Sequence, residues 1–146
     1  MTARADSGLV QTDFAGGAVP VSYTQRTRVT LAQLNAGLTL LPAIPGRNYR
    51  LVDAKLTAIG GAATAGTSVN LIGTRAAAPV QLLVAAIAAL TQSALVRIGA
   101  ANAVILADGA SFTSLDVNTP ITVINVGAPM TTMTALDVDL TFVIEG

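Results

Sequence analysis

The stretch LDVDLTFVIE, residues 136–145, decides the fold that this chain adopts. Leu, Val, Leu, Phe and Ile stand at every second position, and Asp137, Asp139 and Glu145 are among the residues between them. Successive side chains of a β-strand point to opposite faces, so this alternation predicts a strand with one face in a core and the other outside. If the strand lies at an edge, the carboxylates would also discourage unwanted strand pairing.

Extended segments with similar signals recur along the whole chain. They are rich in β-branched residues and are bounded by Gly, Pro, Asn or Asp. We expect strands at about 19–31, 50–59, 67–73, 103–106, 111–115 and 120–126, and a polar connection at 130–135. The apolar segment 38–44 is interrupted by Pro42 and bounded by Pro45-Gly46, which favours a short edge strand or an extended connection.

The segment 50–59 alternates clearly, with Val52, Ala54, Leu56 and Ala58 expected on the core face. The following GGAATAG, residues 60–66, supplies turns and little that could pack in a core. We therefore predict that 50–59 and 67–73 form a hairpin with a long tip.

The stretch 79–101 is ambiguous, because its Leu, Ile and Ala residues also satisfy helical spacing. The polar triplet Thr-Gln-Ser at 91–93 would fall in the middle of a single long helix, and Val and Ile recur throughout. We interpret the stretch as two strands, at about 80–88 and 94–98.

Eight or nine short strands predict an all-β fold, an antiparallel β-sandwich that is jelly-roll-like, with an extended N-terminal arm. The length of 146 residues fits one domain, which we place at 19–146. Residues 1–18 contain only Leu9, Val10 and Phe14 as apolar anchors. Two interpretations stay open: a frayed tail, or an arm that orders on a partner with Phe14 as its anchor.

The chain has no His and no Cys, which removes the commonest proton shuttle, the thiol nucleophile and most zinc ligands. We therefore expect no enzyme activity and no cofactor. Asp137 and Asp139 could in principle hold a hard cation such as calcium, but one strand face supplies few of the about six oxygens required, so we expect a solvated outer face. The net charge of zero disfavours nucleic acid, and no segment has the length and polarity of a signal peptide or membrane span.

The charges are unevenly distributed along the sequence. Residues 1–75 carry seven basic and three acidic side chains, whereas residues 76–146 carry one basic and five acidic side chains. The two halves could present faces of opposite charge for docking between subunits, or the strands could interleave and mix the charges. As candidate partner contacts we single out the arm residues and five residues of the first half of the domain: Leu9, Val10, Phe14, Arg26, Arg28, Arg47, Tyr49 and Arg50.

Arg26 and Arg28 share one face of a strand, where they could grip a carboxylate-bearing partner or serve as exposed solubilising residues. Tyr49 and Arg50 open a strand after the turn at Arg47, which suits an interface. Tyr49 fits a core equally well.

Laid in order, several segments resemble the capsid cement, or decoration, proteins of tailed bacteriophages. The resemblance covers about 45–143 and rests on texture and segment order: GRNYRLVDAKLTAIGG at 46–61, TSVNLIGT at 67–74, LTQSALVRIGAANAVILADGASF at 90–112, NTPITV at 118–123 and the final DVDLTFVIE. It implies a small β-sandwich that forms a dimer or trimer and binds the major capsid protein on the outer surface of the virion, after assembly in the host cytoplasm. A tail, fibre or lectin-like jelly roll that recognises a cell-surface glycan is the alternative.

Overall fold

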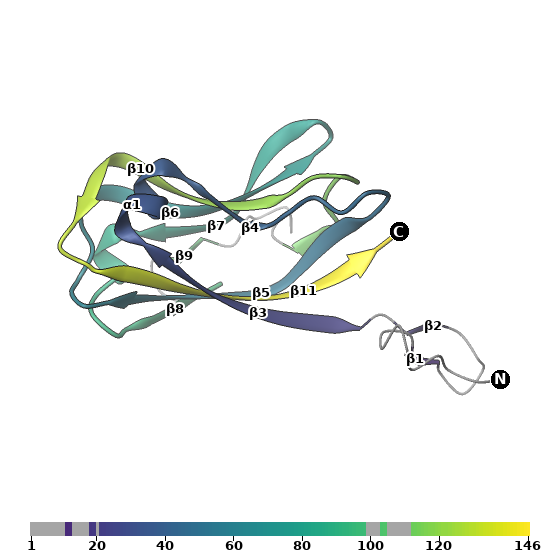
Figure 1. Ribbon diagram of the computed structural model, residues 1–146, viewed down its shortest axis with the longest axis horizontal. Coiled ribbons are helices and arrows are strands. Elements are labelled where there is room, and N and C mark those ends of the chain that lie inside the picture. The colour runs from purple at the N-terminus through teal and green to yellow at the C-terminus, as the bar shows by residue number, and fades with distance from the viewer. Residues whose placement is uncertain (1–10, 13–17, 20, 99–102, 105–111) are drawn as a thin grey trace.

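The computed structural model describes residues 11–12, 18–19, 21–98, 103–104 and 112–146. Two antiparallel sheets pack against each other and confirm the predicted all-β sandwich (Figure 1). The four-stranded sheet has the order β3 (Ser22–Thr30), β11 (Ala135–Glu145), β5 (Asn48–Ile59), β8 (Leu95–Arg97), and the five-stranded sheet has the order β4 (Leu38–Leu41), β10 (Ile121–Thr131), β6 (Thr64–Arg75), β7 (Ala78–Ala86), β9 (Ala103–Val104). The remaining described elements are the strand pair β1 (Gln11–Thr12) and β2 (Ala18–Val19), the helix α1 (Leu31–Ala36) and the 3₁₀ turn η1 (Ile87–Ala89).

The strand order is that of a jelly roll, because the pairs are nested. The strands β3 and β11 are neighbours in one sheet, and β4 and β10 are neighbours in the other. Further inside this nest, β5 pairs with β8 and β6 pairs with β7. Two Greek keys packed as two sheets give this order. The C-terminus and the start of β3 lie at one end of the sandwich, and α1 lies at the opposite end (Figure 1).

The last strand, β11, is an interior strand of its sheet, as its sequence indicates. Every residue from Ala135 to Val143 in β11 pairs with β3, and β5 pairs along the other side of β11 as far as Glu145. Leu136, Val138 and Leu140 are at most 1% exposed and face the core. Burying each of these side chains stabilises the fold by about 1.5–3 kcal/mol.

The predicted hairpin of 50–59 and 67–73 is wrong. Strand β5 belongs to the four-stranded sheet and β6 to the five-stranded sheet, so the glycine-rich segment between them crosses from one sheet to the other. The crossing is tight at Gly60 and Gly61, whose φ angles are 75° and 146°. At Gly61 an added Cβ would lie 2.7 Å from the carbonyl oxygen of Thr132.

The prediction for Val52 is also wrong, because β5 contains a bulge. Thr141 of β11 pairs with Asp53, while the next residue, Phe142, pairs with Leu51. Val52 is therefore the extra residue of β5 and is 39% exposed. A bulge changes which face the following side chains take, and here it coincides with the adjacent apolar residues Leu51 and Val52, where the alternation changes phase.

A short helix follows β3 where the sequence predicted only the end of a strand. The Thr30 side chain accepts a hydrogen bond from the Gln33 backbone, and the Gln33 side chain accepts one from the Thr30 backbone N–H. The sequence motif of this capping box is Thr-x-x-Gln. Leu34 points from α1 into the core and is fully buried.

Several other strand predictions are confirmed, and some need correction. The stretch 80–98 contains two strands, β7 and β8, and β4 is an edge strand. Residues 112–115 form no strand, although Leu115 donates a backbone hydrogen bond to Tyr49. Strand β10 continues beyond Val126 through irregular pairing, and the expected polar connection that follows contains the buried Met130 and Met133.

The hairpin turn between β6 and β7 carries local strain. Its two central residues, Ala76 and Ala77, have φ angles of 52° and 59°. Positive φ at both positions is the requirement of a type I′ turn, which favours Asn-Gly over residues such as Ala. The Asp116 carboxylate accepts hydrogen bonds from both backbone N–H groups, at 3.0 and 2.8 Å, and so holds the turn in place.

We expect Ala76→Asn/Ala77→Gly to stabilise the protein by about 1 kcal/mol, because it relieves the unfavourable φ angles without removing a hydrogen bond. The melting temperature should rise by about 3 °C. Differential scanning calorimetry of the wild type and the variant measures this. A melting temperature that stays the same or falls would contradict the strain inferred at this turn.

Candidate functional site

The charged side chains gather on one face of the molecule. Of the twelve charged residues whose side chains the structure describes, nine lie on the outer face of the four-stranded sheet, and we call this surface the charged face: Arg26, Arg28, Arg50, Asp53, Lys55, Arg97, Asp137, Asp139 and Glu145. The other three, Arg47, Arg75 and Asp116, lie in or beside the turns at the end of the sandwich near the C-terminus. The charged face is therefore the site on which a polar partner would act.

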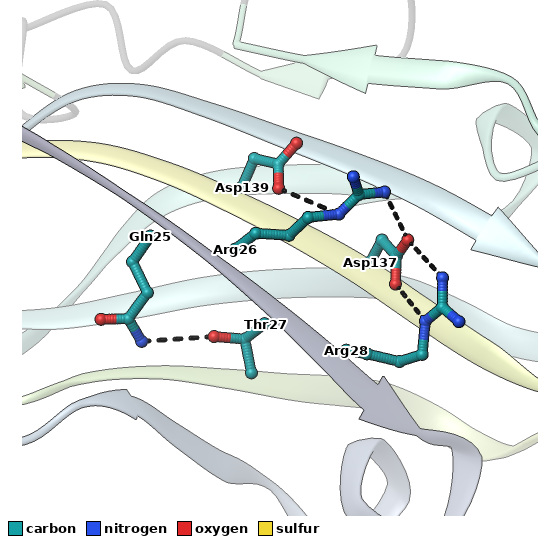
Figure 2. A network of polar contacts seen from close by, with 6 residues as sticks. All are labelled: Gln25, Arg26, Thr27, Arg28, Asp137 and Asp139. Atoms are coloured by element: carbon teal, nitrogen blue, oxygen red, sulfur yellow. Dashed lines mark hydrogen bonds and ion pairs between the residues drawn. The ribbon is translucent and has the colours of Figure 1, made fainter.

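Asp137 is the centre of the charged face. Arg28 binds it with two hydrogen bonds, from Nε to Oδ1 at 2.7 Å and from Nη2 to Oδ2 at 2.9 Å. Arg26 donates from Nη2 to Oδ2 at 2.7 Å, and its Nε lies 3.6 Å from Oδ1 of Asp139 (Figure 2). The register explains this, because β3 places Arg28 opposite Asp137 and Arg26 opposite Asp139.

The burial of this network is uneven. The Asp137 side chain is 3% exposed, whereas those of Arg26 and Arg28 are 66% and 63% exposed. The hydrogen bond from Arg28 is the main reason that the pKa of Asp137 falls to about 2, against the opposing effect of burial. The carboxylate thus fixes two guanidinium groups whose outer sides stay in water.

A second polar group lies further along the same face. Glu145 accepts hydrogen bonds from Arg50 Nε at 2.7 Å and from the Ser114 hydroxyl, and the first of these chiefly lowers its pKa. The carbonyl oxygen of the C-terminal Gly146 accepts a hydrogen bond from Arg47. These contacts hold the end of β11 beside the start of β5.

The structure brings together some of the predicted contact residues and separates others. Arg26 and Arg28 adjoin each other, and Arg50 lies on the same face near the other end of β11. Tyr49 is in the core at 3% exposure, where it donates a hydrogen bond to the Pro42 carbonyl and burial raises its pKa. Of the two predictions for Tyr49, an interface or the core, the structure confirms the core. The predicted contacts Leu9, Val10 and Phe14 lie outside the described residues.

One expectation about charge needs correction, and one alternative that the sequence left open is decided. Asp137 is on the outer face, but it is buried beneath two arginines instead of solvated. The basic and acidic halves of the sequence do not form opposite faces, because the acidic β11 lies between the basic β3 and β5. The strands interleave, and the charges mix on one sheet.

The sequence pattern indicates both arginines and both aspartates as candidate residues but does not pair them. The signal that could have found the pairing is the strand order, since a jelly roll places its first and last strands side by side. With β3 antiparallel to β11, two arginines spaced two apart meet two aspartates spaced two apart. Arg26 and Arg28 thus form their ion pairs with aspartates of their own chain.

The described part of the chain holds no group of three or more His, Cys, Asp or Glu residues placed to bind a metal ion. No helix in that part is long and apolar enough to cross a membrane. Comparisons with protein-family models, curated proteins and solved structures found no match to this chain.

Proposed function

We propose that this chain is a non-enzymatic structural protein that binds the exterior of a viral capsid and cements adjacent major capsid subunits. The observation that carries the proposal is the fixed arginine pair at the centre of the charged face. Arg26 and Arg28 keep about two thirds of their side-chain surface in water while Asp137 sets their positions. Preorganised guanidinium groups lose little side-chain entropy when they bind a carboxylate on a partner.

The fold and the resemblance of several sequence segments support the same proposal. Jelly rolls occur in viral capsid and lectin domains, and the segments from about 45 to 143 resemble phage cement proteins. One small interface binds weakly, but a cement protein that touches two capsid subunits gains an effective-concentration advantage, and many copies stabilise a lattice by mass action. The proposed location is the outer surface of the virion, after assembly in the host cytoplasm.

The test mixes the purified full chain with expanded capsids that lack it. We expect cosedimentation at a fixed copy number and a higher melting temperature of the capsid. Absence of binding together with an unchanged capsid melting temperature would refute the proposal.

A variant locates the contact on the charged face. Lys55 has no ion-pair partner among the described residues, so Lys55→Glu reverses a charge there without breaking a pair. If the partner presents carboxylates, we expect binding to weaken about tenfold. Ala32→Glu adds an acid on the exposed side of α1 and should bind like the wild type. Equal losses in both variants would argue for a general charge effect instead of a specific contact.

The glycan-binding alternative finds little support in the aromatic residues. Tyr23 stacks on Phe142 with ring centroids 5.8 Å apart, and Tyr49 meets the same ring edge to face at 5.5 Å. Among the described aromatic residues, Phe112 alone is exposed by more than a third, at 39%. Competable hits on a glycan array, with no capsid binding, would favour the alternative.

A further inference from the structure

The strand β3 forms one edge of the four-stranded sheet along its whole length. Its residues from Ser22 to Thr30 pair with β11 in a continuous register, and no described strand lies on its other side, which we call the open edge. The other edges of the two large sheets are formed by β8, β4 and β9, of which three, four and two residues are described. With nine residues at about 3.4 Å each, the open edge is about 30 Å long.

The open edge presents the backbone N–H and C=O groups of every second residue. The backbone N–H of Thr30 donates to the Gln33 side chain at 2.9 Å, so it points away from β11. Residues of an antiparallel pair alternate between those that bond to the partner strand and those that point away from it. Because the register of β3 has no irregularity, the N–H groups of Arg28, Arg26 and Thr24 point the same way as that of Thr30. A further strand can bond to these groups.

The open edge lacks the features that usually protect an edge strand. Proteins shield such edges with short strands, bulges, prolines or charged side chains. The strand β3 is long and regular and contains no proline. Its two charged side chains, Arg26 and Arg28, extend across the sheet to Asp137 of β11 (Figure 2). The charges of these arginines therefore do little to keep a further strand away.

The two faces of β3 determine which side chains a further strand should carry. On the inner face the half-buried Tyr23 packs against the core, which favours apolar neighbours. On the outer face Arg26 and Arg28 are 66% and 63% exposed, and the Nη1 atom of each makes no hydrogen bond to a described residue. These groups favour carboxylates. On the other side of β3, β11 meets both requirements with the alternating apolar and acidic residues 136–140.

We propose that the open edge of β3 binds an extended, acidic segment of a partner protein as a further strand of the sheet. The bound segment carries apolar side chains on its inner face and carboxylates on its outer face, beside Arg26 and Arg28. Backbone hydrogen bonds supply the affinity, and the alternate side chains supply the specificity. The inference rests on the proposed function for the identity of the partner, which is then the major capsid protein.

A synthetic peptide tests the open edge without any capsid. The probe is acetyl-Ser-Val-Glu-Val-Glu-Val-Ser-amide, which is titrated into the isotope-labelled full chain and followed by NMR. We expect the backbone amide signals of Thr24, Arg26 and Arg28 to shift, and their hydrogen exchange, which is fast in the free protein, to slow. A peptide with glutamine in place of both glutamates should bind about tenfold more weakly, because it lacks the carboxylates.

Two variants of one residue test whether the backbone of β3 makes the contact. Thr24→Pro removes an N–H group of the open edge, whereas the control Thr24→Val keeps it. Both variants lose the same hydrogen bond between the hydroxyl groups of Thr24 and Thr141. We expect Thr24→Pro to weaken peptide binding about tenfold and Thr24→Val to leave it unchanged. If Thr24→Pro fails to fold by circular dichroism, methylation of alternate backbone nitrogens of the peptide makes the same test, because only one of the two sets faces β3.

The outcomes separate this proposal from the cementing function. Absence of peptide binding overturns it, as does equal binding of the glutamine peptide or an equal effect of the two Thr24 variants. Capsid binding without peptide binding would retain the cementing function and overturn the role of the open edge. Peptide binding without capsid binding would support the open edge as a site for an acidic strand and refute the cementing function.

Discussion

Replacing both Arg26 and Arg28 by alanine is expected to cost about 2–3 kcal/mol of unfolding free energy. The double variant leaves the Asp137 carboxylate, which is 3% exposed, without any of its three charged hydrogen bonds. The cost stays at the lower end for a broken buried pair, because both arginines are themselves mostly exposed and water can replace them in part. Urea denaturation at neutral pH measures the loss.

The matched control is Arg97→Ala, which removes an arginine from an exposed pair on the same face. Arg97 donates to Asp53 at 2.9 Å, and the two side chains are 53% and 23% exposed. Pairs of this kind contribute about 0.2–1 kcal/mol. If the double variant is no less stable than the control, Asp137 does not depend on its arginines.

The ion pairs of Asp137 also predict how the unfolding free energy changes in acid. The pKa of Asp137 is lowered from 3.8 to about 2 in the folded protein, so its stabilising contribution is complete above pH 4. That contribution is lost as the pH falls from about 4 to about 2, because the unfolded chain then binds the proton more readily. The pKa of Glu145 is also lowered, which adds a loss of the same sign. We expect Asp137→Asn to flatten the acid limb of the stability curve.

The alternation of residues 136–145 was sufficient to predict the strand β11. Together with similar alternation in other segments, it was sufficient to predict the β-sandwich. It works because a half-buried strand must place apolar side chains at a period of two. Alternation could not say which strands pair, since that depends on contacts between residues far apart in the chain. The failed hairpin at 50–73 and the missed Arg–Asp pairing both come from this limit.

Local signals outside the alternation explain two further misses. The capping box at Thr30 and Gln33 was readable, but the β-branched run before it favoured an uninterrupted strand. The bulge at Val52 also left a local mark, because Leu51 and Val52 are adjacent apolar residues at which the alternation of the strand changes phase.

Gly61→Ala is expected to destabilise the protein by about 3 kcal/mol or more, which is the largest effect of any single substitution considered. At φ 146° the residue occupies a region that is essentially restricted to glycine, at a cost of about 1–3 kcal/mol for other residues. The new Cβ would also lie 2.7 Å from the Thr132 carbonyl oxygen, a backbone atom that cannot rotate away. Urea denaturation measures the loss.

Gly46→Ala is the control for replacing a glycine of positive φ where no atom is close. Gly46 has a φ of 73°, and an added Cβ there would meet no atom within 4 Å, so only the backbone cost of about 1 kcal/mol applies. A difference of about 2 kcal/mol between the two variants would therefore report the close approach between the β5–β6 crossing and the β10–β11 turn together with the more restricted φ of Gly61. Because β5 and β11 are in one sheet and β6 and β10 in the other, that approach joins the two crossings at the end of the sandwich. Equal losses in the two variants would mean that the crossings do not meet as closely as the structure places them.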